Sequence, residues 1–387
     1  MTGPVVLVAA RRTPIATAGR GFAAHPVDAL AAPVLAAVAH EVAGTGLPID
    51  DVVLGNCMGP GGDVARVAAL RAGLGSGVPG VTVDRQCGSG LDAVVQAAAR
   101  VRSGDAGLVF AGGAESASTA PHRSWRDSGV RYARAPFAPA GFADPDMGPA
   151  ADRLAAIRGI GRDRQDEWAA RSHRLAAAAQ ESGAFDAELV TVDGVARDDR
   201  PRASMDRARL ARFAPAFATD ATGGADAAEG ARATVTAGNS CGFSDGAAAM
   251  AVTTLASAAP LGLPALRVRA TAIAAGDPAL PGLGAAWAAR RALDRAGMTV
   301  ADLGFVEITE AFAAQVLAVS DELGLDESTI SAEGGAIALG HPWGASGAVL
   351  LVRLAARMFR ADDARAGLAA CSIGGGQGVA MIVERAA

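Results

Sequence analysis

Apolar positions along the chain alternate between short strand-like runs and longer helix-like patterns. One series has an apolar strand at 81–83, a glycine turn at 87–90, an apolar helix from 91 to about 102 and an apolar strand at 106–113. Short apolar runs bounded by glycine are typical of buried strands, whereas longer periodic patterns favour helices. Strands that alternate with helices in this way predict an α/β fold.

The same series returns near the C-terminus. Glycine-rich turns occupy 334–347, an apolar helix continues to about 360, and an apolar strand at 366–370 precedes a glycine cluster at 374–376. The run 51–55 resembles 303–308, and each follows a helix and a short turn. The series therefore occurs twice.

Two pairs of positions measure this repetition. Ser89 and Ser346 are 257 residues apart, and Gly107 and Gly367 are 260 apart. A nearly constant offset indicates a duplicated α/β unit, with one copy in each half of the chain.

Between the halves the composition changes to Arg, Asp, Pro and Gly, with one strong helical pattern at 164–180. We interpret 117–243 as an inserted domain, and its Gly/Ala/Asp-rich stretch at 221–233 as a mobile surface loop. Residues 1–116, completed by about 244–264, form the first predicted half. Residues 265–387 form the second.

Composition narrows the class of protein. The 387 residues are 51% hydrophobic, which predicts a large buried core. The net charge of −5 comes without blocks of like charge, so nucleic acid is not an expected partner.

The apolar run 5–10 is followed at once by Arg11 and Arg12, which indicates a buried strand and not a signal peptide. No stretch approaches about 20 consecutive apolar residues. We expect a soluble, cytoplasmic protein with no membrane partner.

The chain contains no Lys, so all 35 basic residues are Arg. This excludes Walker-type phosphate loops, protein kinases and Schiff-base enzymes, which need a Lys. The four Cys lie far apart, form no CxxC pair and do not stand at metal-ligand spacing with the five His. We therefore predict no metal site and no disulfide framework.

Cys87 is the strongest candidate nucleophile. It stands in a glycine turn between a strand and an apolar helix, where unpaired N–H groups and the helix dipole favour a thiolate. His341 lies in the corresponding turn of the second half, which a pseudo-twofold relation would bring close to Cys87. Taken alone, a buried structural Cys and a structural His explain these two positions equally well. The glycines at 374–376 would either expose backbone N–H groups that bind an anion or allow two segments of the sheet to cross closely.

An ordered set of motifs goes further. Seven motifs together resemble thiolases, in that family's order over nearly the whole chain: Val83–Leu91, Gly112–Ser116, Thr236–Asn239, Asp245–Ala248, Thr309–Phe312, Gly334–Gly347 and Gly374–Gly378. The resemblance implies a thiolase fold, with two duplicated α/β halves in an α-β-α-β-α arrangement and an inserted loop domain. It also implies a homo-oligomer, a dimer or tetramer, and coenzyme A or acyl-CoA as substrate without a permanently bound cofactor.

The resemblance also implies residue roles. Cys87 would attack an acyl-CoA with His341 polarising its thiol. The N–H groups of Cys87 and Gly374 would hold the oxyanion, and position 309 would hold a water near the enolate. Arg202 matches a position near the coenzyme-A nucleotide, although a solvated loop Arg explains it as well. The remaining family positions, which line the pantetheine and acyl channel, are Met147 and Phe312.

Several positions depart from the family. A second catalytic Cys is expected two residues before Gly374, but Ser372 stands there and Cys371 is one step early. Since side chains alternate along a strand, we expect Cys371 to point away from the site and leave a weak acid–base group. The other departures are Thr309 for Asn, Asp146 for His and Glu333 for Asn.

Three hypotheses follow. The first is an acyl-CoA C-acyltransferase that makes or cleaves a 3-oxoacyl-CoA through an acyl thioester on Cys87. The second is a divergent acyltransferase of secondary metabolism that passes the acyl group to another acceptor or to water. The third is a non-catalytic partner subunit, which retention of Cys87 and His341 disfavours. A serine hydrolase is disfavoured because the GxSxG motif is missing.

Overall fold

The computed structural model describes residues 3–217, 233–363 and 365–386. Residues 221–232 of the predicted surface loop therefore lie outside the described residues. The strands are β1 (Val5–Arg12), β2 (Ala16–Thr17), β3 (Asp51–Gly55), β4 (Gly80–Val83), β5 (Leu108–Ser116), β6 (Arg123–Ser124), β7 (Arg131–Tyr132), β8 (Ser244–Thr254), β9 (Leu266–Ala275), β10 (Leu303–Ile308), β11 (Ala366–Ile373) and β12 (Gln377–Arg385). The α-helices are α1 (Val27–Val42), α2 (Val64–Arg71), α3 (Ser89–Ser103), α4 (Met147–Arg158), α5 (Arg162–Glu181), α6 (Arg207–Leu210), α7 (Leu255–Ala258), α8 (Gly284–Ala296), α9 (Ala313–Leu323), α10 (Ala336–Leu339) and α11 (Trp343–Arg360). Short 3₁₀ turns cover Ala43–Thr45, Ala259–Leu261, Pro281–Leu283 and Val300–Asp302.

Strand pairing shows the duplication directly. The order is β10-β11-β12-β9-β1-β8-β5-β3-β4, with β2 attached to β8. In the first half β3 is parallel to β5 and β5 is antiparallel to β8; in the second β10 is parallel to β11 and β11 is antiparallel to β12. The halves meet where β1 pairs with β9 over only two residue pairs, Val6↔Arg267 and Leu7↔Leu266.

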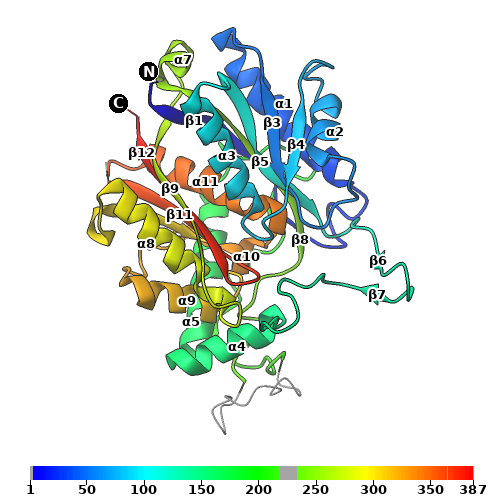
Figure 1. Cartoon of the computed structure of the whole chain (residues 1–387). Coiled ribbons are helices and arrows are strands. Elements are labelled where there is room, and N and C mark those ends of the chain that lie inside the picture. The colour runs from blue at the N-terminus through cyan, green and yellow to red at the C-terminus, as the bar shows by residue number, and fades with distance from the viewer. Residues whose placement is uncertain (1–2, 218–232, 364, 387) are drawn as a thin grey trace.

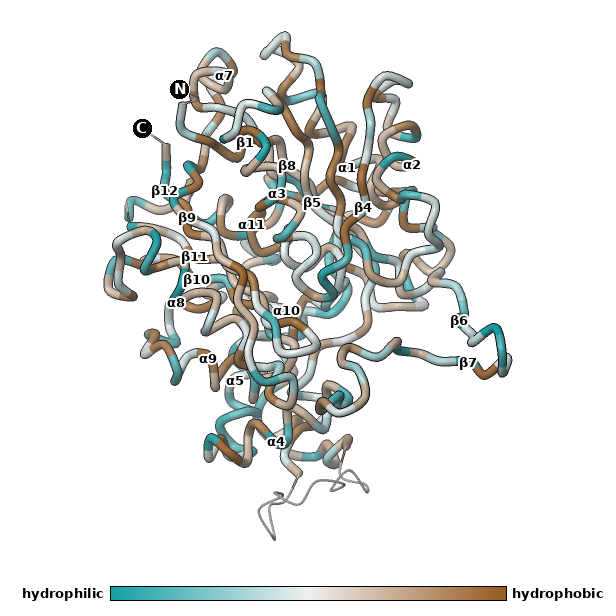
Figure 2. Tube along the Cα trace, in the orientation of Figure 1, coloured by the Kyte–Doolittle hydropathy of each residue, from teal (hydrophilic) through white to brown (hydrophobic). Residues whose placement is uncertain are grey.

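Three hydrophobic clusters place the helices in layers. One cluster packs α3 and α11 between the two half-sheets, a second packs α1 and α2 on the outer face of the first half, and a third packs α8 and α9 on the outer face of the second (Figure 1). Figure 2 shows the strands of the sheet largely in hydrophobic colours. Both faces of each half-sheet are covered, as strands with unbroken apolar runs require. The predicted five-layer α-β-α-β-α class is confirmed.

The segment between β5 and β8 carries α4, α5, α6 and a small hairpin. The helix predicted at 164–180 is α5, Arg162–Glu181. The hairpin of β6 and β7 projects from the body as an arm (Figure 1), with Trp125 stacked on Tyr132 at a centroid distance of 4.7 Å. Trp125 and Val130 of this arm are exposed.

A buried ion network ties this segment to both halves. Glu188 accepts from Arg12 Nε of β1 at 2.7 Å and from Arg353 Nη1 of α11 at 2.7 Å, and Arg12 also donates to both carboxylate oxygens of Asp198. All four side chains are buried. Buried guanidinium groups need such carboxylates, because desolvation would otherwise disfavour their charge.

Helix α1 with its 3₁₀ extension, Val27–Thr45, is the one candidate among the described residues with the length and apolar composition of a membrane span. Half of it is buried, and it packs against β5 and β8. A core helix passes the same test, so this feature is weak support for a membrane span.

Candidate active site

The turn that carries Cys87 is held by hydrogen bonds to one strained residue. Gln86 has φ of +46°, a left-handed conformation that non-glycine residues seldom adopt. Its carbonyl accepts from Ser89 Oγ at 2.6 Å and from Cys57 Sγ at 3.1 Å, while Ser89 Oγ also accepts from the Arg85 N–H at 2.8 Å. These contacts offset the backbone strain and fix Cys87 one residue before Gly88, the N-cap of α3.

The Cys87 and His341 turns meet because α3 and α11 start against each other. A Cβ atom on Gly90 would lie 2.7 Å from the Gly344 carbonyl oxygen and 2.9 Å from the Ala348 nitrogen. Only glycine permits backbones this close. The expected proximity of the two turns is thus built into the first turns of both helices.

Glu115 supports the same junction from β5. One of its carboxylate oxygens accepts from the N–H groups of Cys57 and Gly344, both at 3.0 Å, and the other accepts from the Asn56 amide at 2.9 Å. Burial raises the pKa of this carboxyl, against the lowering effect of its hydrogen bonds. Its position inside the motif Gly112–Ser116 is the only sequence signal for Glu115, and that signal predicts no role for the carboxyl.

The ring of His341 is hydrogen-bonded to Ser346. His341 Nδ1 lies 2.6 Å from Ser346 Oγ, which also lies 3.1 Å from the Pro342 carbonyl oxygen. When the Ser346 hydroxyl donates to that carbonyl, it accepts the Nδ1–H of His341. Nε2 is then the unprotonated nitrogen, and it is buried without a hydrogen-bond partner among the described residues. Burial lowers the pKa of His341 to about 4, so the ring is neutral near pH 7. Nε2 of His341 can therefore act as a general base.

The sulfur of Cys87 is not a resting thiolate. Burial raises the pKa of Cys87, and nearby Cys241 and Cys371 add to the effect. This outweighs the helix-terminus effect that the sequence favoured. A neutral thiol beside a neutral imidazole needs proton transfer in the course of attack. Cys241, which follows the motif Thr236–Asn239, is a neighbour that sequence reasoning missed.

The structure reverses the expected orientations on β11. Cys371 Sγ lies 3.2 Å from Thr309 Oγ1, and both residues are buried. Ser372 faces the opposite side, where its Oγ donates to Gly282 O at 2.7 Å and accepts from the Ala285 N–H at 3.0 Å, at the start of α8. The prediction that Cys371 points away was wrong, and so was Ser372 as a site residue.

Thr309 and Glu310 follow β10. The Thr309 N–H donates to the Ala370 carbonyl at 3.2 Å, which holds the residue beside β11. Glu310 accepts from Trp168 Nε1 at 3.0 Å and from Ser172 Oγ at 2.7 Å, both on α5. Burial raises the pKa of Glu310 to about 7. Glu310 thereby anchors the inserted segment beside the site.

The end of β11 lies against the Cys87 turn. A Cβ on Gly88 would lie 2.4 Å from Ile373 Cδ1, so the residue after Cys87 contacts the residue before Gly374. On its other side Gly374 is covered by the Phe137 ring, 2.5 Å from an added Cβ. The two predicted oxyanion donors, Cys87 and Gly374, therefore belong to adjoining segments.

The predicted binding residues occupy two places. Met147 begins α4, and the next residue, Gly148, packs against the Phe217 ring, which meets Phe312 edge to face at 6.3 Å. Met147 and Phe312 therefore flank one aromatic cluster. Arg202 is exposed in the segment before α6.

Two other positions that depart from the thiolase pattern form ion pairs. Asp146 pairs with Arg134 at 3.0 Å, and Glu333 pairs with Arg360 at 2.6 Å.

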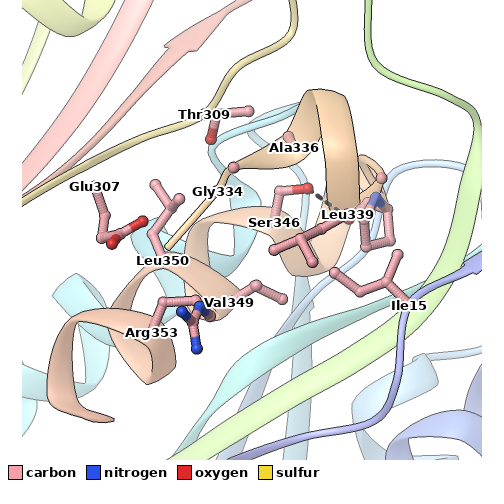
Figure 3. A pocket seen from close by; sticks show the side chains of 13 residues that line it. Ile15, Glu307, Thr309, Gly334, Ala336, Leu339, Ser346, Val349, Leu350 and Arg353 are labelled. Atoms are coloured by element: carbon pink, nitrogen blue, oxygen red, sulfur yellow. Dashed lines mark hydrogen bonds between the residues drawn. The ribbon is translucent and has the colours of Figure 1, made fainter. Parts of the chain in front are cut away.

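A small internal cavity of about 20 Å³ lies behind the site (Figure 3). Its lining includes Thr309, Ser346 and Arg353, and the apolar side chains of Leu339 and Leu350. This is space for about one water molecule. It is too small to hold an acyl chain.

Comparison with known proteins agrees with this geometry. Residues 5–256 match the thiolase N-terminal domain and residues 263–385 match the thiolase C-terminal domain. The chain belongs to the thiolase family. It is therefore an acyltransferase of thiolase type.

Two bacterial relatives match over their whole length. An acetyl-CoA acetyltransferase of Pseudomonas aeruginosa is 40% identical, and one of Cupriavidus necator is 42% identical; each match covers 98% of this chain and 99% of the relative. The crystal structure of the Bacillus anthracis acetyl-CoA acetyltransferase superposes with a TM-score of 0.90 at 34% identity, covering 100% of this chain and 99% of that one.

Proposed function

We propose that this thiolase is an acyl-CoA C-acyltransferase that makes or cleaves a 3-oxoacyl-CoA through an acyl thioester on Cys87. The observation that carries the proposal is the unpartnered, buried Nε2 of His341, whose Nδ1 is hydrogen-bonded to Ser346, on a turn packed against the Cys87 turn. Full-length relatives named acetyl-CoA acetyltransferases support acetyl-CoA as a substrate. Coenzyme A and acyl-CoA are then substrates, without a permanently bound cofactor.

In the first half-reaction, acylation of Cys87, His341 takes up one proton and Cys371 gives up another. Nε2 of His341 takes the Cys87 proton as the sulfur attacks the thioester carbonyl, and the N–H groups of Cys87 and Gly374 face the oxyanion. Collapse breaks the bond to the coenzyme-A sulfur, which takes the proton of Cys371. The enzyme then holds an acyl-Cys87, an imidazolium and a Cys371 thiolate.

The second half-reaction restores these groups. The Cys371 thiolate removes an α-proton from a second acyl-CoA, with Thr309 beside it. The resulting carbanion attacks the acyl-Cys87 carbonyl and forms the carbon–carbon bond. The Cys87 sulfur leaves and recovers its proton from His341. Burial raises the pKa of Cys371 to about 12, which makes its thiolate a strong base.

Cys371 also weakens the case for the divergent acyltransferase. That hypothesis drew on the supposed loss of the second catalytic thiol at Ser372. The structure instead provides a thiol beside Thr309, so an acceptor without an α-proton is no longer needed to explain the sequence.

Intact-protein mass spectrometry after mixing with acetyl-CoA tests the acyl-enzyme. The wild type should gain the mass of one acetyl group, and Cys87→Ala should gain none. His341→Asn should acylate at least about 10²-fold more slowly, because a general base is lost. Acetyl adduct persisting on Cys87→Ala would contradict the assignment.

Assembly into a homo-oligomer, a dimer or tetramer, is part of the proposal. The projecting β6–β7 arm exposes Trp125 and Val130, apolar side chains of the kind that interfaces bury. Arg202 as a contact to the coenzyme-A nucleotide and a cytoplasmic location stay predictions.

A further inference from the structure

Arg200 is a half-buried cation without a carboxylate partner among the described residues. Its Nη2 donates to the Ile337 carbonyl oxygen at 3.3 Å, whereas its Nε is buried and has no hydrogen-bond partner in the described part of the chain. Asp199, its neighbour in the sequence, accepts instead from the N–H and the Oγ1 of Thr17, at 3.0 and 2.9 Å. The charge of Arg200 is therefore held without an ion pair.

This environment disfavours the charged guanidinium. Burial lowers the pKa of Arg200. Of the charges around it, two act in the same direction as burial and two act against it: Arg202 and Arg20, and Cys241 and Asp199, respectively. A desolvated guanidinium that lacks a carboxylate partner costs folding free energy.

Other desolvated arginines have more compensation. Arg353 pairs with Glu188 at 2.7 Å. Arg171, whose pKa burial also lowers, donates to two carbonyl oxygens and lies over the Trp168 ring at 4.9 Å. Arg200 has only its hydrogen bond to α10 within the part of the chain that the structure describes. A residue that serves the fold so little is expected where function requires it.

The guanidinium of Arg200 is packed against the backbone of Gly242. A Cβ added to Gly242 would lie 2.7 Å from Cζ of Arg200 and still closer to Nη1, so the guanidinium occupies the space that a larger residue at 242 would need. From this position Nη2 reaches Ile337 in α10. We call these two contacts the Arg200 clamp, because they join α10 to the segment 241–243.

Both clamped segments border His341. The His341 N–H donates to the Gly242 carbonyl oxygen at 3.2 Å, and Phe243 pairs with His341 as an isolated parallel bridge. Helix α10 ends at Leu339, two residues before His341. Burial alone lowers the pKa of His341, so the charge of Arg200 does not act on the ring directly. The clamp therefore reaches His341 only through the backbone on either side of it.

We propose that Arg200 is a positioning residue for acyl transfer, whose guanidinium holds Gly242 and α10 together and so fixes the turn that carries His341. Its effect on the reaction rate rests on the proposed acylation of Cys87, whereas the clamp itself does not. Misplacing a reacting group by about 1 Å can cost about 10²-fold in rate, so a general base needs support of this kind.

Hydrogen exchange followed by mass spectrometry tests the clamp without any reaction. The variant is Arg200→Ala. The control is Arg197→Ala, at an exposed arginine three residues earlier, so each variant loses one positive charge and changes the net charge from −5 to −6. Amides of residues 337–341 should exchange at least about fivefold faster in Arg200→Ala, because local opening no longer has to break the clamp. The control should change by less than about twofold.

Acylation of Cys87 by acetyl-CoA tests the consequence for the reaction. Arg200→Ala should acylate about 10–10²-fold more slowly at saturating acetyl-CoA. The half-saturating concentration should change by less than about twofold, because the clamp contacts the backbone beside His341 and not the substrate. Arg200→Met, which keeps much of the side-chain volume, should show the same slower acylation and faster exchange, and it replaces Arg200→Ala if that variant does not fold.

Added guanidinium chloride gives a rescue test. Well below denaturing concentrations, it should speed acylation by Arg200→Ala at least about threefold over sodium chloride of the same ionic strength, because it refills the space beside Gly242. It should not speed the wild type or Arg197→Ala.

The outcomes separate this proposal from the proposed function. A wild-type protein that is not acylated would refute the function, and hydrogen exchange would still decide the clamp. Three results would overturn the proposal: unchanged exchange of 337–341 in Arg200→Ala, equal effects of Arg200→Ala and Arg197→Ala, or a raised half-saturating concentration with an unchanged saturating rate. The last result would make Arg200 a substrate contact.

Discussion

A single residue step on β11 decides which side chain reaches the substrate. Cys371 and Ile373 face α3 and the Cys87 turn, and Ser372 between them faces α8. Counting back two residues from Gly374 placed Ser372 at the site. Ile373 and Cys371 face that side instead, because the side chain of Ile373 fills the space beside Gly88.

Replacing Cys371 and Ser372 separately tests this orientation. Cys371→Ala should leave acylation of Cys87 largely intact and slow carbon–carbon bond formation or thiolysis by about 10²–10⁴-fold, because a proton-transfer group is lost. Ser372→Ala should change both steps little and lower the free energy of unfolding by about 1 kcal/mol, since two hydrogen bonds at the start of α8 disappear. Pre-steady-state rates and urea unfolding measure the two effects. The opposite pattern would restore Ser372 to the site.

The depressed pKa of His341 predicts how acylation depends on pH. A general base must be neutral, and a pKa of about 4 keeps His341 neutral well below the ordinary value of 6.5. The acylation rate should therefore show no loss from His341 protonation between pH 7 and about 5, and fall only near pH 4. Stopped-flow acylation against pH measures this. A tenfold fall centred on pH 6.5 would show that the ring is solvated.

The same shift makes the fold sensitive to acid. The unfolded chain binds a proton at His341 below about pH 6.5, whereas the folded chain resists it down to about 4. Stability is therefore present above pH 6.5 and lost as the pH falls through this window, because the unfolded state then binds more protons.

At the scale of elements, the site depends on how closely α3 and α11 approach. Gly90→Ala would push a methyl group to within 2.7 Å of the Gly344 carbonyl, where backbone must move. We expect a loss of about 1–3 kcal/mol of stability and slower acylation, because the Cys87 and His341 turns separate. Gly77→Ala, which meets nothing within 4 Å, is the matched control and should be nearly neutral. Equal effects of the two substitutions would show that the crossing does not set the site geometry.

At the scale of the whole molecule, Glu188 joins the inserted segment to β1 and α11. Glu188→Gln would leave Arg12 and Arg353 with less compensation inside the protein, and breaking a buried ion pair typically destabilises by about 3–5 kcal/mol. Asp163→Asn breaks the exposed Arg207 pair and should change stability by less than about 1 kcal/mol. Urea midpoints compare the two variants. Similar small shifts in both would remove the network's structural role.

The β6–β7 arm allows a test of the proposed homo-oligomer. Light scattering should give a mass above the 38.4 kDa of one chain, and Trp125→Asp with Val130→Asp should lower it, because charges replace apolar contact surface. A change at exposed Arg126 to Asp, on the same arm, is the control and should have a smaller effect. A wild-type protein that stays monomeric at micromolar concentration would contradict the proposed oligomer.

Much of this protein follows from the sequence alone. Apolar periodicity and the near-constant offset predicted two α/β halves and the helix that became α5, because these signals are local and repeat along the chain. The ordered motifs predicted the family and pointed to Cys87 and His341. The division at 116, 243 and 264 stays a prediction.

Tertiary structure decided what depends on distant segments meeting. The direction in which Cys371 points follows from the packing of Ile373 on Gly88, nearly 300 positions away in the chain. The orientation of the His341 ring follows from its hydrogen bond to Ser346. The resting state of Cys87 follows from burial among groups that include two other thiols. No local pattern records these contacts, because side-chain direction and desolvation arise only when the two halves close on each other.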